Sequence, residues 1–402
     1  GKTHPVNEEQ PKTIVTEFNN VTTAFMVSGV NRIHRISWEQ VEPPNKYVAA
    51  VSNNTVIGVV KLEDRIIFLL DLEKVVANLN PKLGLRLDDL GEDWTNEGYR
   101  ALIDEKTKAV FCESVGNPLG NVTDFEKLAE IAHQHGVPLI VDNTVPSPYL
   151  CRPFEHGADI VVHALTKFIG GHGTTLGGVV VESGTFNWGN GNFPSMTEPV
   201  ESYGGIRWWD NFGEYGFLTK LRSEQLRDIG PSLSPQSAFN LLQGVETLPQ
   251  RIDAHVANAR IVAEWLASDP RISFVTWAGL DGHPHQERAQ KYLPLGPGSV
   301  FAFGVRPSGT FDSDHARIEA ARATGEKFID SLQLASHLAN IGDARTLVLH
   351  PASTTHQQLT AEQLEAGGVS ADLIRISVGI EDPEDILWDL DQALTQATGE
   401  NR

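Results

Sequence analysis

The 402-residue chain has 52 acidic and 32 basic residues, and its formal charge of −20 argues against nucleic acid and anionic membrane surfaces as partners. Hydrophobic residues make up 40% of the composition, which is enough for the cores of two or three domains. The two cysteines, Cys112 and Cys151, are too few for a disulfide framework or a zinc knuckle, so we expect inert core thiols.

The sequence carries no signal for export or for insertion into a membrane. No apolar run approaches the ~20 residues that a membrane-spanning helix needs. The first ten residues, GKTHPVNEEQ, are polar, unlike a signal peptide. We therefore expect a cytoplasmic protein in a reducing compartment.

Residues 1–92 are predicted to form a β-rich segment. Residues alternate at strand spacing in Ala24–Val27 and in Ile33–Ile36. Beyond a break at Pro43-Pro44, the stretch Val56–Val76 has the pattern of two strands around a charged turn, followed by a short helix. This pattern is typical of hairpins and not of the start of an α/β sheet.

Two stretches of this segment, GVNRIHRISWEQVEPP and IGVVKLEDRIIFLLDLEKV, resemble part of a CheW-like chemotaxis coupling domain, over about residues 12–90. The resemblance implies an adaptor that joins receptor and kinase through β-sheet contacts. The acidic, turn-rich stretch Leu83–Gly98 follows, and we expect the junction with a different domain there.

Residues 93–235 are predicted to form an α/β domain. Apolar strands within Lys108–Pro118, Val137–Asp142 and Ala158–Ser183 end in polar residues, which indicates a mostly parallel sheet with a site at the carboxyl ends of its strands. A helix at Phe125–His135 connects the first two strands in a right-handed crossover. Its N-terminus shows a capping-box pattern of Thr123 with Glu126, and Gly136 ends it.

Lys167 lies where the third strand runs into a glycine-rich turn, in DIVVHALTKFIGGHG. A lysine at a strand end can snorkel to solvent, and burying its ammonium is costly unless chemistry needs it. A desolvated lysine is also the residue that forms Schiff bases with carbonyl cofactors such as pyridoxal phosphate. Asp142, at the end of the preceding strand, fits the carboxylate that keeps the pyridine nitrogen of that cofactor protonated.

Residues 236–402 are predicted to form an α+β domain, joined to the first by a helical tract from about Leu218 to Arg260 that breaks near Pro231 and Pro235. Apolar patterns predict three strands, Val300–Val305, Thr346–Leu349 and Leu373–Val378, and a last helix capped by Asp382, with Pro383 in its first turn and Ile386, Leu390 and Leu394 on one face.

The stretches ESVGNPLGN, VPLIVDNTVPSPYL and HALTKFIGGHGTTLGG, together with ANIGDARTLVLHPASTTHQQL and LIRISVGIEDPEDILWDLDQAL, resemble the Cys/Met-metabolism pyridoxal-phosphate enzymes, over about residues 94–402. Within that family the chain is most similar to the O-acetylhomoserine sulfhydrylases. The resemblance implies an α/β, aspartate-aminotransferase-like fold that binds pyridoxal 5'-phosphate. It also implies γ-replacement: O-acetyl-L-homoserine and sulfide or a thiol give homocysteine or a thioether and acetate, in methionine and cysteine biosynthesis. Family members are homo-oligomers, dimers of dimers, that build each site from two subunits.

The resemblance also implies roles for five residues. Lys167 would carry the cofactor and move protons at the α and β carbons of the substrate, and Asp142 would pair with the pyridine nitrogen. Asn117 would bind the phenolic oxygen of the cofactor and also contact the substrate. Thr166 would bind the phosphate, and Arg375 would hold the substrate carboxylate through its planar fork. From local pattern alone, Asn117 would belong to a turn and Arg375 would be a surface charge.

The chain departs from the family at the phosphate end of the expected site. Ala164 stands where the family has a phosphate-binding serine, and the bulkier Leu165 follows. The first 110 residues hold no Tyr-x-Arg pair and no glycine-rich loop opening a helix. A coupling adaptor, or a composite chain with an enzyme-like fold and impaired catalysis, therefore stays open beside the enzyme hypothesis.

We expect no catalytic role for the remaining motifs. His163 and His172 flank Lys167, and we expect both to be structural, since hydrogen-bonded histidines outnumber catalytic ones. Nothing in the sequence resembles a metal-binding cluster. The stretch Phe186–Trp209 is dense in glycine, proline and aromatic residues and is expected to serve as a subunit interface or lid.

Overall fold

The computed structural model describes residues 12–18, 21–27, 56–61, 66–70, 103–354 and 369–402. Contacts divide the chain into two units, Gly1–Glu92 and Asp93–Arg402, and each is described by itself. Within the described residues, no helix is long and apolar enough to cross a membrane.

The described residues of the first unit form two antiparallel strand pairs. Strand β1 (Lys12–Phe18) pairs with β2 (Val21–Val27), and β3 (Val56–Lys61) pairs with β4 (Ile66–Leu70). The β-rich prediction is confirmed at these strands. The expected strand at Ile33–Ile36, the Pro43-Pro44 break and the junction within Leu83–Gly98 lie outside the described residues.

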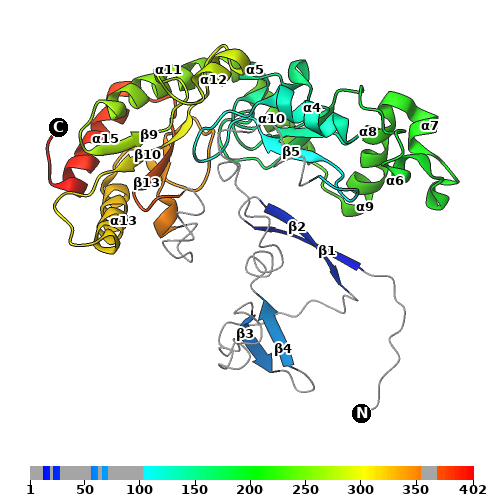
Figure 1. The fold of residues 1–402 in the computed structure, drawn as a ribbon, viewed down its shortest axis with the longest axis horizontal. Coiled ribbons are helices and arrows are strands. Elements are labelled where there is room, and N and C mark those ends of the chain that lie inside the picture. Colours follow the sequence, from blue (N-terminus) through cyan, green and yellow to red (C-terminus); the bar gives the residue numbers. More distant parts are fainter. Residues whose placement is uncertain (1–11, 19–20, 28–55, 62–65, 71–102, 355–368) are drawn as a thin grey trace. The chain divides into compact units, whose positions relative to one another are not determined.

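The second unit begins with a four-stranded sheet in the order β5-β6-β7-β8. Figure 1 labels its first strand, β5. Strands β5 (Val110–Glu113), β6 (Leu139–Asp142) and β7 (Ile160–Ala164) are parallel, as predicted. Strand β8 (Gly178–Glu182) pairs with β7 in the antiparallel direction. In the described part of this sheet β8 is an edge strand, which is why much of its apolar run remains exposed.

Helix α4 (Phe125–Gln134) connects β5 to β6 and buries its apolar face, including Phe125 and Ile131. The predicted capping box is wrong. Asp124 is the N-cap and accepts the N–H of Lys127, while the hydroxyl of Thr123 donates to the carbonyl of Glu113 at 2.6 Å. Since Thr123 is already engaged with β5, the neighbouring carboxylate takes over the cap. Gly136 follows in a left-handed conformation, as expected.

Short helices and one long helix link this sheet to the C-terminal part. The bounds are α5 (Ser147–Leu150), α6 (Pro194–Thr197), α7 (Trp208–Phe212), α8 (Gly216–Lys220), a π-helical turn at Leu221–Leu226, α9 (Arg227–Ile229), α10 (Pro235–Glu246) and α11 (Leu248–Ala267). The helical tract therefore breaks between α9 and α10, where Pro231 lies, and again at Thr247.

Four aromatic residues of the stretch Phe186–Trp209 pack on the chain's own core. Phe186, Trp188, Phe193 and Trp208 are all buried. Trp188 stacks on Phe217 with ring centroids 4.7 Å apart. The expectation that this stretch serves as a subunit interface or lid stays a prediction.

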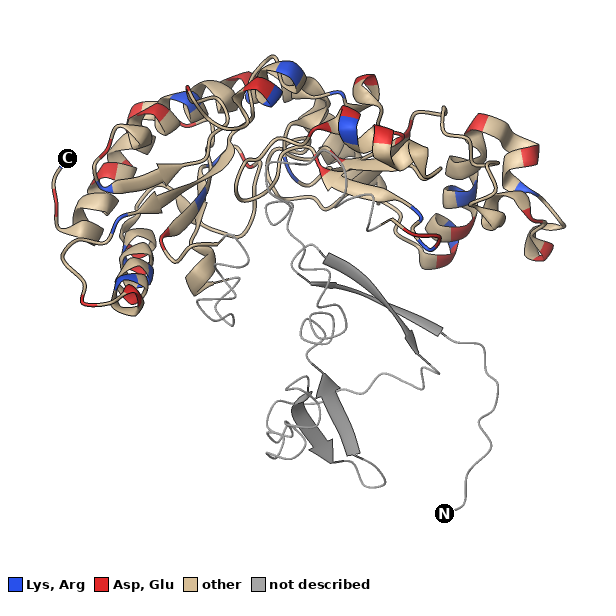
Figure 2. Ribbon diagram, viewed as in Figure 1, with Lys and Arg blue, Asp and Glu red and all other residues tan. Residues whose placement is uncertain are grey.

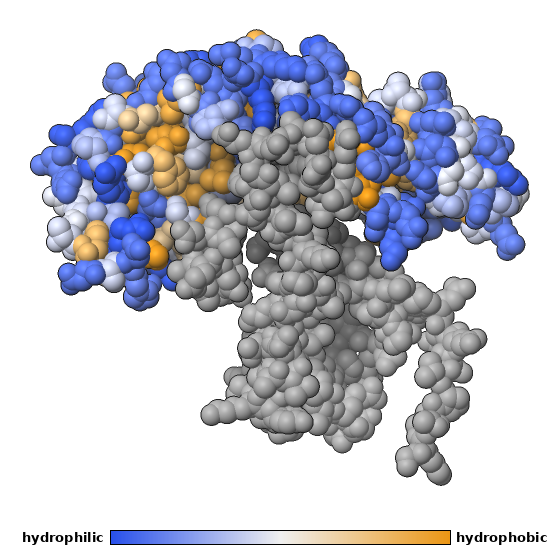
Figure 3. Space-filling model, in the orientation of Figure 1, coloured by the Kyte–Doolittle hydropathy of each residue, from blue (hydrophilic) through white to orange (hydrophobic). Residues whose placement is uncertain are grey.

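A second sheet lies in the C-terminal part, in the order β11-β12-β13-β10-β9. Its strands are β9 (Ile272–Val275), β10 (Val300–Val305), β11 (Ser336–His337), β12 (Leu347–Leu349) and β13 (Leu373–Ser377). The helices that share its core are α11, α13 (Asp314–Ser331) and α15 (Pro383–Thr398), whereas α12 (Gln286–Tyr292) packs against α4 of the first core. The three predicted strands and the last helix are confirmed. The helices carry most charged residues (Figure 2), and on the viewed face apolar side chains gather over this sheet and beside β5 (Figure 3).

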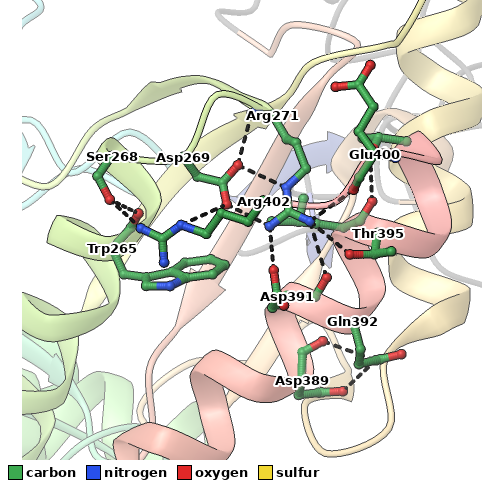
Figure 4. A network of polar contacts seen from close by, with 12 residues as sticks. Trp265, Ser268, Asp269, Arg271, Asp389, Asp391, Gln392, Thr395, Glu400 and Arg402 are labelled. Atoms are coloured by element: carbon green, nitrogen blue, oxygen red, sulfur yellow. Dashed lines mark hydrogen bonds and ion pairs between the residues drawn. The ribbon is translucent and has the colours of Figure 1, made fainter.

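The C-terminal residues are tied to this domain by a polar network (Figure 4). The fully buried guanidinium of Arg271 pairs with Asp269 at 2.7 Å and with Asp391 at 2.5 Å. Arg402 lies over the ring of Trp265, 4.7 Å from its centroid, and also approaches Asp269. Buried charges need partners of this kind, and the network satisfies them.

Candidate active site

The carboxyl ends of β5, β6 and β7 meet at one edge of the first sheet. Asp142 ends β6 and lies level with Glu113 of β5 and Val162 of β7. Asn117 follows β5 in a loop that is held by its own main-chain N–H, which donates to the Glu113 carboxylate at 3.0 Å. Lys167 follows β7. The parallel topology therefore brings three of the five predicted site residues to the same edge.

Lys167 is half-buried, and its ammonium donates a hydrogen bond of 2.5 Å to the side-chain oxygen of Asn340. Burial lowers the pKa of Lys167, and the positive charge of Arg375 lowers it further. The turn after β7 fixes the residue, because the N–H of Lys167 donates to the carbonyl of Ala164 and its carbonyl accepts from Gly171. The lysine therefore does not snorkel freely to solvent, and it gives up its proton more readily than an exposed lysine.

Arg375 reaches the same place from the second sheet, on β13. Its guanidinium donates to the main-chain carbonyl of Asn340 at 3.0 Å and to the side-chain oxygen of Asn117 at 3.5 Å. The side chain is buried, and burial lowers its pKa to about 10. In the described part of the chain no carboxylate pairs with Arg375, so a buried cation faces the cluster without an anion.

Asn340 is the residue that the sequence analysis missed. Its side chain binds Lys167 and its carbonyl binds Arg375, so it links the two cations. Asn340 belongs to the stretch ANIGD, which resembles the family, but its local pattern indicates only a loop asparagine. The following Gly342 could have drawn attention to it: this residue has a φ of +74°, and a Cβ there would lie 2.6 Å from the nitrogen of Phe168. Only glycine lets this loop pack so closely on the lysine turn.

Asp142 is half-buried, and its carboxylate accepts the N–H of Thr144 at 2.9 Å. The hydroxyl of Thr144 in turn accepts the N–H of Ala164 at 2.8 Å, which ties the end of β6 to the end of β7. His163, on β7, is buried, and burial lowers its pKa although Asp142 acts in the opposite direction. Its Nδ1 finds no hydrogen-bond partner among the described residues.

Thr166 lies beside Lys167 in the wall of a pocket of about 270 Å³. Its hydroxyl accepts the N–H of Gly177 at 3.1 Å, which closes the glycine-rich loop. The pocket does not include Lys167; its lining is Thr166, Gly170, His172, Gly173, Thr174, Thr175, Asn240, Leu241, Gln243 and Gly244. His172 is exposed and bonds the carbonyl of Gly170, so it serves the loop.

The described residues offer no reactive thiol and no metal site beside this cluster. Cys112 and Cys151 are free and buried, and burial raises the pKa of each thiol to about 12, so both stay protonated and unreactive at neutral pH. Among the residues that the structure describes, no group of histidine, cysteine or acidic side chains is arranged to hold a metal ion.

Comparison with known proteins adds two family matches. Residues 49–395 match the model of the Cys/Met metabolism PLP-dependent enzymes, and residues 1–80 match the CheW-like domain. The O-acetyl-L-homoserine sulfhydrylase of Leptospira meyeri is 45% identical over 323 residues, which is 78% of this chain and 70% of the relative. The homocysteine/cysteine synthase of Saccharomyces cerevisiae is 46% identical over 300 residues, 74% of this chain and 67% of the relative.

A solved structure shows the same fold. The putative O-acetylhomoserine (thiol)-lyase of Campylobacter jejuni, crystallised with a pyridoxyl-lysine monophosphate, superposes with a TM-score of 0.68 at 36% identity, over 74% of this chain and 68% of that one. The predicted pyridoxal-phosphate transferase fold is therefore confirmed.

Proposed function

The chain belongs to the Cys/Met metabolism PLP-dependent enzymes, and on that premise we propose that it catalyses γ-replacement on O-acetyl-L-homoserine. Sulfide or a thiol displaces acetate, and the product is homocysteine or a thioether, as in methionine and cysteine biosynthesis. Relatives that carry the names O-acetyl-L-homoserine sulfhydrylase and homocysteine synthase, at 44–48% identity, support this reaction.

The residues at the strand ends fit the ring end of pyridoxal phosphate. When bound, the cofactor supplies an electron sink for the carbons of an amino acid. Lys167 offers an amine for its aldehyde, Asp142 a carboxylate for its ring nitrogen and Asn117 an amide for its phenolic oxygen. The phosphate end has fewer hydrogen-bond donors. Thr166 is the expected phosphate ligand, and Ala164 offers no hydroxyl.

Lys167 is assigned the proton transfers. Its lowered pKa brings the amine nearer to neutral pH, where a group can both accept and return a proton. In γ-replacement it takes the proton from the substrate α carbon and moves protons at the β carbon. The side-chain oxygen of Asn340 accepts a hydrogen bond from the ammonium of Lys167 and thereby orients it.

The observation that carries the proposal is the buried guanidinium of Arg375 beside Lys167, which has no carboxylate partner in the described residues. A buried arginine without an anion is costly, and an α-carboxylate would satisfy its planar fork. Asn340 and Asn117 already fix the guanidinium from two sides, so the amino-acid substrate would bind with its α carbon close to Lys167.

The test is an assay of homocysteine formation from O-acetylhomoserine and sulfide, with cofactor in excess. We expect no turnover in Lys167→Ala. Arg375→Leu should raise KM for O-acetylhomoserine by at least about ten-fold, since a charge-assisted hydrogen bond contributes about 1.5–3 kcal/mol. The exposed Arg317 of α13 gives a control, Arg317→Leu, that leaves both constants unchanged. An unchanged KM in Arg375→Leu would contradict the assignment.

A second candidate function rests on the CheW-like match of residues 1–80. The strand pairs β1–β2 and β3–β4 suit an adaptor that binds receptor or kinase by β-sheet contacts. Titration of the full chain into a purified chemoreceptor signalling domain, followed by calorimetry, tests this role. Saturable binding would support it, and the absence of heat at high concentration would rule it out.

We also propose a domain organisation, a cellular compartment and an assembly for the chain. Residues 1–92 form the β-rich segment, 93–235 the cofactor domain and 236–402 the C-terminal domain. The acidic charge and the enzyme relatives support a cytoplasmic protein that acts on small-molecule substrates. A homo-oligomer built as a dimer of dimers is the expected assembly.

A further inference from the structure

Helix α11 buries three polar side chains along one of its sides. Arg251, His255 and Asn258 are 7%, 1% and 8% exposed, and their spacings of four and three residues place them one above another on the helix. A buried guanidinium, imidazole or amide costs free energy unless it forms hydrogen bonds. The partners of these three residues, which we call the α11 polar stripe, therefore determine what this side of the helix holds in place.

Arg251 binds the turn that carries Lys167. Its guanidinium donates to the main-chain carbonyls of Phe168 at 2.7 Å and Ile169 at 3.1 Å. These are the two residues that follow Lys167, so the arginine fixes the main chain directly beside the lysine. Without the guanidinium, buried carbonyls of this turn would lose their donors, and the turn would have to change its conformation to find others.

The partners of this guanidinium are neutral. In the part of the chain that the structure describes, its other hydrogen bonds go to the carbonyl of Gly244 on α10 at 2.7 Å and to the hydroxyl of Thr247 at 3.2 Å. Gly171 leaves it room, since a Cβ there would lie 2.4 Å from Nη1 of the arginine. The planar fork of Arg251 therefore serves the main chain of the turn and not another charge.

The other two residues of the stripe bind the chain at the end of β13, the strand that carries Arg375. Nδ1 of His255 meets the carbonyl of Val378 at 2.7 Å. Because a carbonyl can only accept, the proton of the neutral ring is on this nitrogen. The amide of Asn258 donates to the carbonyl of Glu381 at 2.7 Å, a little further along the chain.

The α11 polar stripe thus joins the two segments that bring cations to the candidate site. His255 contacts both, because its ring also lies T-shaped against that of Phe168, with centroids 5.3 Å apart. A helix rises about 1.5 Å per residue, so the stripe is a rigid spacer of about 10 Å. Catalytic groups need to be held within about 0.5 Å of their productive geometry, and Lys167 and Arg375 come from different sheets.

We propose that Arg251, with His255 and Asn258, positions Lys167 relative to Arg375. The stripe sets the separation at which the amine of Lys167 meets the α carbon of a substrate whose carboxylate is bound by Arg375. This inference rests on the proposed function for its substrate, but its claim concerns the place of Lys167. None of the three residues touches the reacting atoms, so each acts through the segment that it holds.

Kinetics of homocysteine formation, with cofactor in excess, give the first readout. Arg251→Gln should lower kcat by about 100-fold, the effect of a displacement of about 1 Å between reacting groups. KM for O-acetylhomoserine should stay within about three-fold, because Arg375 keeps its own partners and still binds the carboxylate. Arg251→Lys keeps the charge and part of the hydrogen bonding, so its kcat should lie between those of the wild type and Arg251→Gln.

The second readout is the pKa of Lys167 in the full-length, cofactor-free protein. Labelling with fluorodinitrobenzene as a function of pH, followed by peptide mapping, measures it, because only the free amine reacts. Burial and the charge of Arg375 lower this pKa in the wild type. In Arg251→Gln the lysine moves away from both influences, so its pKa should rise. A loss of stability alone would not change the pKa of the folded protein.

Two controls separate position from stability. Val262→Ala removes two methyl groups from the second core on the same helix, where Val262 is fully buried, and should leave kcat and the pKa of Lys167 unchanged. His255→Leu should lower kcat, whereas His255→Gln, whose amide can still donate to Val378, should restore most of it. Circular dichroism verifies that each variant is folded, and Arg251→Lys is read where Arg251→Gln is not.

An unchanged pKa of Lys167 in a folded Arg251 variant would overturn the proposal, and so would equal effects of Val262→Ala. Failure of both Arg251 variants to fold would show a structural role alone and would also overturn it. The labelling needs neither cofactor nor turnover. It therefore decides the place of Lys167 even if the wild type does not act on O-acetylhomoserine, and the two failures are told apart.

Discussion

Replacing Ala164 by serine is expected to tighten the binding of pyridoxal phosphate. Ala164 is the last residue of β7 and is half-buried, with its N–H bound to the hydroxyl of Thr144 at 2.8 Å. It pairs across the ladder with Gly178, whose missing side chain leaves space beside it. A serine hydroxyl therefore fits without displacing the strand, at the phosphate end of the proposed site.

The size of the effect follows from the kind of bond that the serine adds. A hydrogen bond to a charged group contributes about 1.5–3 kcal/mol. This corresponds to a dissociation constant that is roughly ten to a hundred times lower. The starting point should be weak, because the hydroxyl of Thr166 is already engaged with Gly177 and the rest of the described site serves the ring end.

The assay is a titration of pyridoxal phosphate into the cofactor-free protein, followed by the visible absorbance of the bound form. Ala164→Cys is the matched control, since it adds an atom of similar position but only a weak donor. We expect the affinity order Ser, then Cys and Ala together. Tight stoichiometric uptake by the unmodified chain, or equal affinities of the serine and cysteine variants, would refute the reasoning.

Three further outcomes are expected. Borohydride treatment of the protein with cofactor should fix the label on Lys167, and a label on another lysine would sink the assignment. Asp389 is buried and accepts the main-chain N–H groups of Gln333, Leu334 and Ala335 at 2.7–2.9 Å (Figure 4 shows its place on α15), so Asp389→Ala should lower the free energy of unfolding by about 3 kcal/mol in urea titrations, unlike the exposed Asp385→Ala. Burial lowers the pKa of His255 from 6.5 to about 4, so the unfolded chain binds more protons between these values and stability should fall, by up to about 3 kcal/mol, as the pH drops through that window. His255→Gln should flatten this slope, and a slope that is unchanged would exclude His255 as its source.

The periodicity of apolar residues was sufficient to predict those helices and strands that bury one face, or all, of their side chains in the core. The bounds of strand β10 and the start of helix α15 agree with the prediction, because their apolar positions face the core with strand and helix periods. The capping box at Thr123 failed for a reason that no local pattern contains: its hydroxyl is bound to the neighbouring strand β5. The burial of Trp188 could not be read from local pattern either, since its stacking partner Phe217 comes from another element.

Asn340 was missed because its function depends on contacts between distant parts of the chain. It lies in the loop between β11 and β12 of the second sheet. Its side chain binds Lys167, which follows β7 of the first sheet, and its main-chain carbonyl binds Arg375 on β13. A periodicity argument sees only an asparagine in a loop. Parallel topology, by contrast, could be read from the sequence, so the meeting of Asn117, Asp142 and Lys167 at one sheet edge was predictable.

The described residues divide the proposed site into two ends of unequal strength. At the ring and carboxylate end, Lys167, Asn340, Arg375 and Asn117 form a connected chain of hydrogen bonds whose two cations lack an anion. An anionic ligand stabilises such a cluster. An amino-acid carboxylate therefore gains binding free energy both from its own hydrogen bonds and from neutralising the two cations. At the phosphate end one hydroxyl is occupied and one is missing. Affinity for the cofactor, more than chemistry at Lys167, should therefore limit the activity of this chain, and the serine at position 164 separates these two possibilities because it changes the phosphate end alone.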